Sequence, residues 1–209
     1  MAGKSSEGAM DAARGALKEH FGYDGFRPGQ ETLVEAVLSG RDCLGVMPTG
    51  AGKSICYQIP GVVLPGLTLV VSPLVSLMGD QVRALLDADV RGSYLNSTLT
   101  PGQQGTVMRR ALAGAYDIMY VAPERLADPR FIEFASQASI PLIAIDEAHC
   151  VSQWGQDFRP AYLGIGEFIG RFVKTLFRCL VCAIPLRWLP GLTVPTSILP
   201  LSSFRQNAS

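Results

Sequence analysis

The residues MPTGAGKS at 47–54 lie between a short apolar run, CLGVM at 43–47, and a segment with the pattern of a helix at 52–59. Glycine-rich backbone between a strand and a helix can bring amide groups against phosphate oxygens. In such a loop Lys53 can reach the β and γ phosphates, and the Ser54 hydroxyl can ligate magnesium. The strict G-x-x-x-x-G-K-[ST] pattern has a methionine here in place of its first glycine. A glycine-rich turn that happens to precede Lys-Ser is therefore the alternative interpretation.

Short apolar runs alternate with helical patterns along the rest of the chain. Beyond the first run, strands are predicted at 67–72, 116–121 and 141–147, and helices at 52–59, 75–88, 101–113 and 129–138. Residues 9–38 resemble two helices separated by the turn FGYDGFRPGQ. Strict alternation of strand and helix predicts an α/β fold with a central parallel sheet covered by helices on both faces.

Composition limits the class of protein. The formal net charge is zero, so any nucleic-acid contact has to come from local basic or aromatic clusters. The N-terminus lacks the apolar core of a signal peptide, and the longest uncharged stretch, 59–79, is interrupted by three prolines. We expect a cytoplasmic protein with no membrane partner, nucleoid-associated if it is bacterial, and its five cysteines to be reduced.

The tail, residues 171–209, differs from the rest of the chain. All acidic side chains lie before residue 168, and prolines recur at 185, 190, 195 and 200. Because proline weakens central strands, we expect this segment not to complete the sheet. Its C-x-x-C pair, Cys179 and Cys182, lacks the two further ligands that a tetrahedral zinc site needs.

The string IAIDEAHC at 143–150 places two carboxylates after a predicted strand, where open α/β sheets hold their ligands. Asp146 can hold the magnesium shell, and Glu147 can polarise the water that attacks a γ-phosphate. Such a pair taken alone is more often a solvated loop. A phosphate loop far enough upstream for intervening βα units favours the catalytic interpretation.

Together these motifs resemble the motor domain of superfamily 2 helicases, and the strings around them resemble the RecQ family. The matching strings are FRPGQ at 26–30, VVSPLVSLMGDQV at 70–82, YVAPERL at 120–126 and CVSQWGQDFRPAYLGIG at 150–166. The resemblance covers about residues 10–170. It implies a RecA-like P-loop domain, incomplete at its C-terminal end, with domain bounds at 1–38, 39–170 and 171–209.

The resemblance also implies a role for individual residues in the nucleotide site. Tyr23 and Arg27 would hold adenine between a ring and a guanidinium, and the Gln30 amide would read its N6 and N7 edge. An ordinary surface turn is the alternative for Tyr23 and Arg27. The remaining residues expected to bind the nucleotide are Thr49, Gly50, Gly52, Lys53 and Ser54.

The aromatic-rich string is implied to couple DNA to the nucleotide site. Trp154 and Phe158, beside Arg159, offer the flat surfaces and the cation that bind single-stranded nucleic acid, although burial of both rings in the core is the alternative. Gln156 stands where the family commonly has histidine, and His149 would bridge to the second motor domain. The segment 72–81 would place amide donors near the DNA backbone.

The implied function is that of an ATP-dependent 3′–5′ DNA helicase of RecQ type, acting in recombination and repair with ATP and Mg²⁺ as cofactors. Its partners would be single-stranded DNA and duplex junctions. The family's second RecA-like domain, which supplies arginine fingers, does not follow in this sequence. We therefore expect nucleotide binding, feeble ATPase activity and no unwinding. A catalytically inert, nucleotide-dependent nucleic-acid-binding module is the alternative.

Overall fold

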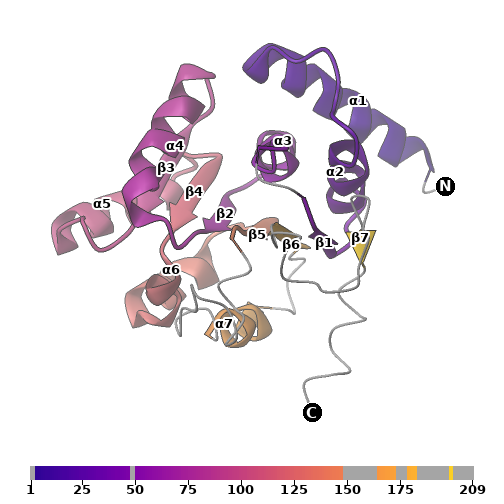
Figure 1. Ribbon diagram of the computed structural model, residues 1–209. Helices are drawn as coiled ribbons and strands as arrows, with labels where there is room; N and C mark the ends of the chain where they lie inside the picture. The colour runs from indigo at the N-terminus through magenta and orange to yellow at the C-terminus, as the bar shows by residue number, and fades with distance from the viewer. Residues whose placement is uncertain (1–2, 48–49, 148–163, 173–177, 183–197, 200–209) are drawn as a thin grey trace.

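The computed structural model describes residues 3–47, 50–147, 164–172, 178–182 and 198–199, in which strands and helices alternate (Figure 1). The helices are α1 (Gly3–Phe21), α2 (Gln30–Leu38), α3 (Ile55–Val63), α4 (Val75–Asp87), α5 (Pro101–Leu112), α6 (Pro129–Gln137) and α7 (Gly164–Phe172). The strands are β1 (Cys43–Gly45), β2 (Thr68–Val71), β3 (Gly92–Leu95), β4 (Ile118–Val121), β5 (Leu142–Ile145), β6 (Arg178–Cys182) and β7 (Ile198–Leu199).

The strands form one sheet in the order β3-β4-β2-β5-β6-β1-β7. Every pair is parallel except the edge pair of β1 and β7. The expectation that the tail does not complete the sheet is wrong, because β6 pairs with both β5 and β1 in the middle of it. The five residues of β6 end before the first of the regularly spaced prolines, Pro185, so proline does not interrupt their hydrogen bonding.

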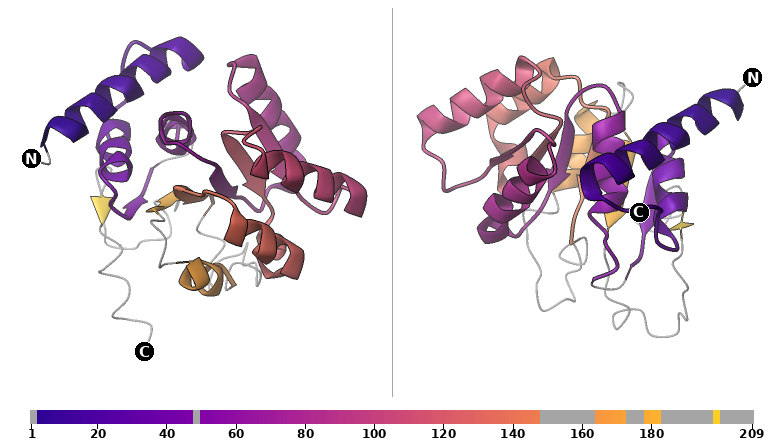
Figure 2. Two further views of the ribbon diagram at one scale, coloured as in Figure 1. Left: turned by 180° about the vertical axis from the view of Figure 1, so that it is seen from behind. Right: turned by 90° about the horizontal axis from the view of Figure 1, so that it is seen from above.

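Helices cover both faces of the sheet, as predicted (Figure 2). Side chains along β2 alternate: Val70 packs with residues of α2, α3 and α4, whereas Leu69 and Val71 pack with residues of α5, α6 and α7. β4 and β5 alternate in the same way. Burial on both faces explains why these strands read as unbroken apolar runs in the sequence.

The N-terminal helix α1 forms an additional layer over α2 and α3. Met10, Ala13 and Leu17 are buried against Val34 of α2 and Ile59 of α3. The connection between α1 and α2 therefore lies in this helical layer, where Arg27 contacts Gly50 of the loop that follows β1. This packing holds the residues between the two helices close to the loop that follows β1.

The boundaries differ from the predicted ones in instructive places. α3 begins at Ile55 rather than at residue 52, because Gly52–Ser54 form a turn before the first helical residue. The short strand β3 was not predicted, since its sequence GSYL contains no apolar run.

Among the described residues, no helix is both long and apolar enough to span a membrane.

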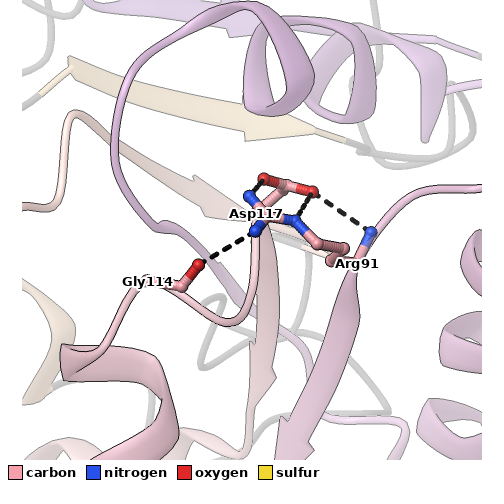
Figure 3. A network of polar contacts seen from close by, with 3 residues as sticks. All are labelled: Arg91, Gly114 and Asp117. Atoms are coloured by element: carbon pink, nitrogen blue, oxygen red, sulfur yellow. Dashed lines mark hydrogen bonds and ion pairs between the residues drawn. The ribbon is translucent and has the colours of Figure 1, made fainter.

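Near the amino ends of β3 and β4 an ionic network joins the two strands (Figure 3). The guanidinium of Arg91 donates to both carboxylate oxygens of Asp117 and, over 3.0 Å, to the carbonyl of Gly114. The backbone N–H of Arg91 donates to Asp117 Oδ2 over 3.1 Å. The network therefore fixes the start of the edge strand at the end of the sheet opposite the phosphate loop.

Candidate nucleotide-binding site

Two described glycines of the loop after β1 have the backbone that a phosphate-binding turn uses. Gly50 and Gly52 have φ angles of +82° and +75°, in the left-handed region that glycine adopts without steric cost. Ser54 caps α3 without a hydrogen bond from its side chain, so its hydroxyl stays available to a ligand. Because Ser54 is the N-cap of α3, the amino end of this helix faces the loop, as anion binding at a helix terminus requires. Thr49, which was also expected to bind the nucleotide, lies outside the described residues.

The acidic pair follows β5 directly. Asp146 is 7% exposed, and its backbone N–H donates to Val71 O over 2.9 Å, which continues the pairing of β5 with β2. Its Oδ1 accepts the N–H of Glu147 over 2.9 Å. Glu147 has a φ of +50°, unusual for a residue with a side chain, and such backbone outliers concentrate at functional sites.

The structure brings the loop and the acidic pair together. Lys53 Nζ lies 3.6 Å from Glu147 Oε1, and the two side chains are only 15% and 24% exposed. β1 and β5, which carry these segments, are separated in the sheet by β6 alone. A cation and a carboxylate thus meet at the carboxyl end of parallel strands, which is where ligands bind in this class of fold.

The segment between α1 and α2 packs directly on the phosphate loop. Arg27 Nη1 donates to Gly50 O over 3.1 Å. Gln30, 3% exposed, accepts the N–H of Arg27 over 2.8 Å and donates to the carbonyls of Ala51 and Gly52 over 3.1 and 3.0 Å. Both N–H groups of the Gln30 amide are therefore engaged with the loop, and one lone pair of its oxygen remains for a base.

A cavity of about 450 Å³ opens beside this segment. Tyr23, which is 47% exposed, lines it together with Arg27 and Gln30. Its other lining residues include Gly50, Gly52 and Ser54 of the loop. Among the described residues, the three expected to recognise adenine therefore share one cavity with the expected phosphate loop.

Several predicted site residues cannot be placed against this geometry. His149, Trp154, Gln156, Phe158 and Arg159 all lie outside the described residues. Of the segment 72–81, Ser72 is buried and its Oγ accepts the N–H of Leu74 over 3.4 Å, just before α4 begins. The hydroxyl of Ser72 therefore stabilises the turn into that helix.

A model of DEAD/DEAH box helicases matches residues 27–180, about three quarters of the chain. The chain belongs to this helicase family. The ATP-dependent DNA helicase RecQ of Haemophilus influenzae is 49% identical over 160 residues, covering 77% of this chain and 26% of that protein. RecQ of Bacillus subtilis is 47% identical over 157 residues, covering 75% and 27%. The predicted RecQ resemblance is thereby confirmed, and this helicase chain spans about a quarter of the length of these relatives.

Solved structures agree on the fold of this helicase domain. A hypothetical ATP-dependent RNA helicase from Sulfolobus tokodaii superposes with a TM-score of 0.63 at 22% identity, over 83% of this chain and 50% of that one. The DUF1998 helicase MrfA bound to DNA superposes with a TM-score of 0.63 at 20% identity, over 83% and 26%. At these identities the likeness shows the fold alone, the RecA-like α/β domain that was predicted.

Among the residues missed by sequence reasoning are three polar ones that line the cavity. They are Gln58 of α3, Gln81 of α4 and Tyr120 of β4. Burial raises the pKa of the Tyr120 phenol, and the charge of nearby Asp146 raises it further, so this hydroxyl stays protonated. The three residues lie in separate elements; Gln81 and Tyr120 belong to two of the quoted strings, whereas Gln58 lies in the predicted helix 52–59 and in no motif.

Proposed function

We propose that this chain is the nucleotide-binding motor domain of an ATP-dependent DNA helicase of RecQ type. In the whole protein it would bind Mg²⁺-ATP and single-stranded DNA and, joined to a second RecA-like domain, support 3′–5′ unwinding. The observation that carries the proposal is the ion pair of Lys53 with Glu147 beside a cavity lined by Tyr23, Arg27 and Gln30.

The ion pair gives each partner a defined task when a triphosphate binds. The γ-phosphate competes with Glu147 for Lys53, because phosphate carries more charge than a carboxylate. Glu147 is then released to orient and polarise the attacking water. Arg27 and Tyr23 hold the base, while Gln30 keeps the turn at Gly52 in the shape that aims its amides at the phosphates.

The residues present fit a magnesium ion held mainly by phosphate. Mg²⁺ typically uses one or two protein carboxylates and keeps waters and phosphate oxygens as its other ligands. Asp146 is a buried carboxylate, and the Ser54 hydroxyl has no capping bond. Among the described residues there is no cluster of three or more His, Cys, Asp or Glu that would hold a metal by itself. The ion would neutralise charge on the transferring phosphate.

The proposed DNA contact rests on sequence. Trp154, Phe158 and Arg159 combine aromatic surfaces with a cation, as single-strand binding requires. These residues follow Asp146 and Glu147 closely in the sequence. A short stretch of chain would therefore link bound DNA to the nucleotide site. His149 and Gln156 belong to the same stretch.

The direct test is to measure nucleotide binding by the purified chain, using the fluorescence of a labelled ATP analogue with and without Mg²⁺. We expect binding to the unaltered chain and a loss of at least tenfold in Lys53→Ala, because each charge-assisted hydrogen bond contributes about 1.5–3 kcal/mol. Lys18→Ala is the matched control, since Lys18 is exposed and pairs with Asp24 on the surface. Equal binding by all three proteins would overturn the nucleotide site.

ATP hydrolysis separates a motor from an inert binding module. Glu147→Gln keeps the size of the side chain and removes the carboxylate, so nucleotide binding is expected to persist while turnover falls. Weak turnover that rises with single-stranded DNA and disappears in Glu147→Gln supports the motor. Binding without any hydrolysis that depends on Glu147 supports the inert module.

A further inference from the structure

One side chain ties the carboxyl end of α1 to the carboxyl end of α4. His20 lies in the last turn of α1, and its Nδ1 atom is 2.9 Å from the backbone carbonyl oxygen of Ala88, the C-cap residue of α4. In the view of Figure 1, α1 runs over α2 and α3 and ends toward α4. The contact therefore fastens the end of the N-terminal layer to a helix that packs directly on the sheet.

The chemistry of the partner assigns the hydrogen on the His20 ring. The last carbonyls of a helix have no partner within the helix. At the end of α4, Asp89 has a φ of +56° and the N–H of Val90 donates to Leu85 O over 2.8 Å, the pattern of a Schellman motif. The carbonyl of Ala88 can only accept, so Nδ1 carries a hydrogen and donates it. The ring thus supplies a donor to a carbonyl at the end of α4.

Both of the joined helix ends contribute to the nucleotide cavity. Tyr23 follows His20 by three residues, and Ala84 and Leu85 lie about one turn before Ala88 in α4. These three residues line the cavity of about 450 Å³. The placement of Tyr23 relative to the α4 residues therefore depends on the bond between the two helix ends.

The connection that carries Tyr23 is anchored again at its other end. Arg27 donates to Gly50 O, and Gln30 donates to the carbonyls of the phosphate loop. Between the two anchors Tyr23 is 47% exposed, so burial holds its ring only in part. The hydrogen bond of His20 fixes one side of this connection and the contacts of Arg27 and Gln30 fix the other.

We propose that His20 is a positioning residue for the nucleotide site. By donating its Nδ1 hydrogen to Ala88 O, it holds Tyr23 where the ring covers the base of the bound nucleotide. The inference rests on the proposed function, since it requires Tyr23 to contact a base. His20 itself does not touch the nucleotide, and the carboxyl end of α4 becomes part of the framework that shapes base binding.

The test compares a ligand that has a base with one that has none. ATP and inorganic tripolyphosphate, each with Mg²⁺, are titrated by calorimetry into the chain, His20→Phe and His20→Asn. Phenylalanine keeps a ring and removes the donor, whereas the Nδ2 of asparagine is as many bonds from the backbone as Nδ1. Loss of one neutral hydrogen bond lowers the population of the binding-competent arrangement by about two- to tenfold. We expect His20→Phe to weaken ATP by this factor and to leave tripolyphosphate unchanged, and His20→Asn to bind ATP like the unaltered chain.

A double-mutant cycle tests whether His20 acts through Tyr23. In a Tyr23→Ala background, His20→Phe is expected to have no further effect on ATP affinity, because the ring that it positions is gone. Additive losses would overturn the inference. Glu19→Gln, at an exposed position next to His20, is the control and changes the affinity for neither ligand.

A purely structural role gives a different result. It would lower the melting temperature of His20→Phe and leave the ratio of ATP to tripolyphosphate affinity as in the unaltered chain, which would overturn the inference. If the chain binds ATP in a Lys53-dependent way and His20→Phe binds it equally well, only the role of His20 fails. If the unaltered chain binds neither ligand, the proposed function fails and the inference fails with it.

Discussion

Replacing Gly52 by alanine tests whether Gln30 braces the phosphate loop. A Cβ atom at this position would lie 2.7 Å from Gln30 Nε2, too close for the side chain to stay where it is. Gly50 provides a matched control, because its φ is also positive but nothing lies within 4 Å of its Cβ position. The two variants therefore share the strain of a left-handed alanine and differ in the contact with Gln30.

The magnitudes follow from the hydrogen bonds of Gln30. A left-handed conformation costs an alanine about 1–2 kcal/mol, which is the expected loss in Gly50→Ala. Gly52→Ala additionally displaces Gln30 Nε2 from Ala51 O and Gly52 O. At about 0.5–1.5 kcal/mol for each hydrogen bond, this adds about 1–3 kcal/mol. The free energy of unfolding should therefore fall further in Gly52→Ala than in Gly50→Ala.

Urea denaturation followed by circular dichroism measures both losses. Combining Gly52→Ala with Gln30→Ala removes the clash, so the double variant should lose less than the sum of the two single variants, by about the same 1–3 kcal/mol. Equal losses in Gly50→Ala and Gly52→Ala, or strictly additive losses in the double variant, would refute the bracing role of Gln30.

Two further predictions concern the core and the edge of the sheet. Burial raises the pKa of the Cys43 and Cys56 thiols to about 12, above the ordinary value of 9.0, so the folded state favours the neutral thiol. The free energy of unfolding that this neutral form contributes is fully present below pH 9 and is lost as the pH rises toward 12. Iodoacetamide at pH 8, followed by peptide mapping, should modify both cysteines in urea but neither in the native protein. Labelling of the native protein would contradict the burial of these thiols. Asp117→Asn should lower the free energy of unfolding by about 0.5–1 kcal/mol, because it weakens charge-assisted bonds from Arg91, whose side chain is 61% exposed to screening solvent. Asp80→Asn, which removes an exposed ion pair with Arg83, should have no measurable effect, and equal effects in the two variants would show that the Arg91 network adds nothing (Figure 3).

The sequence was a good guide where a residue's environment is set by its near neighbours. The runs that became β1, β2, β4 and β5 are apolar because both faces of the sheet are covered, and that pattern needs no knowledge of the partner strands. β3 has no such apolar run, so it was not predicted. Its residues Gly92 and Ser93 are buried, with α4 and α5 packed against the strand, although neither residue is large or apolar. Its place in the sheet depends on pairing with β4.

In the candidate site, too, features set by local sequence could be predicted, whereas features set by packing between distant elements could not. The closeness of the two motifs could be expected from the rule that parallel strands present their carboxyl ends together. The ion pair of Lys53 with Glu147 itself was not predicted. The engagement of Gln30 with the loop was not predicted, because the N-terminal helices reach the loop only through the packing of α1 on α3. Gln81 and Tyr120 reach the same cavity for a similar reason, because α4 and β4 pack beside it.

β6 shows why a tail that looks foreign in sequence still bears on the site. Neighbouring strands lie about 4.8 Å apart, so two strands with one between them are separated by about 10 Å. β1 and β5 have that separation because β6 hydrogen-bonds to both. The long side chain of Lys53 and the left-handed turn at Glu147 close this gap to 3.6 Å. The separation of the strands that carry Lys53 and Glu147 therefore depends on residues 178–182. The composition of the tail pointed away from the sheet, but strand pairing is decided by the backbone hydrogen bonds available at an open edge.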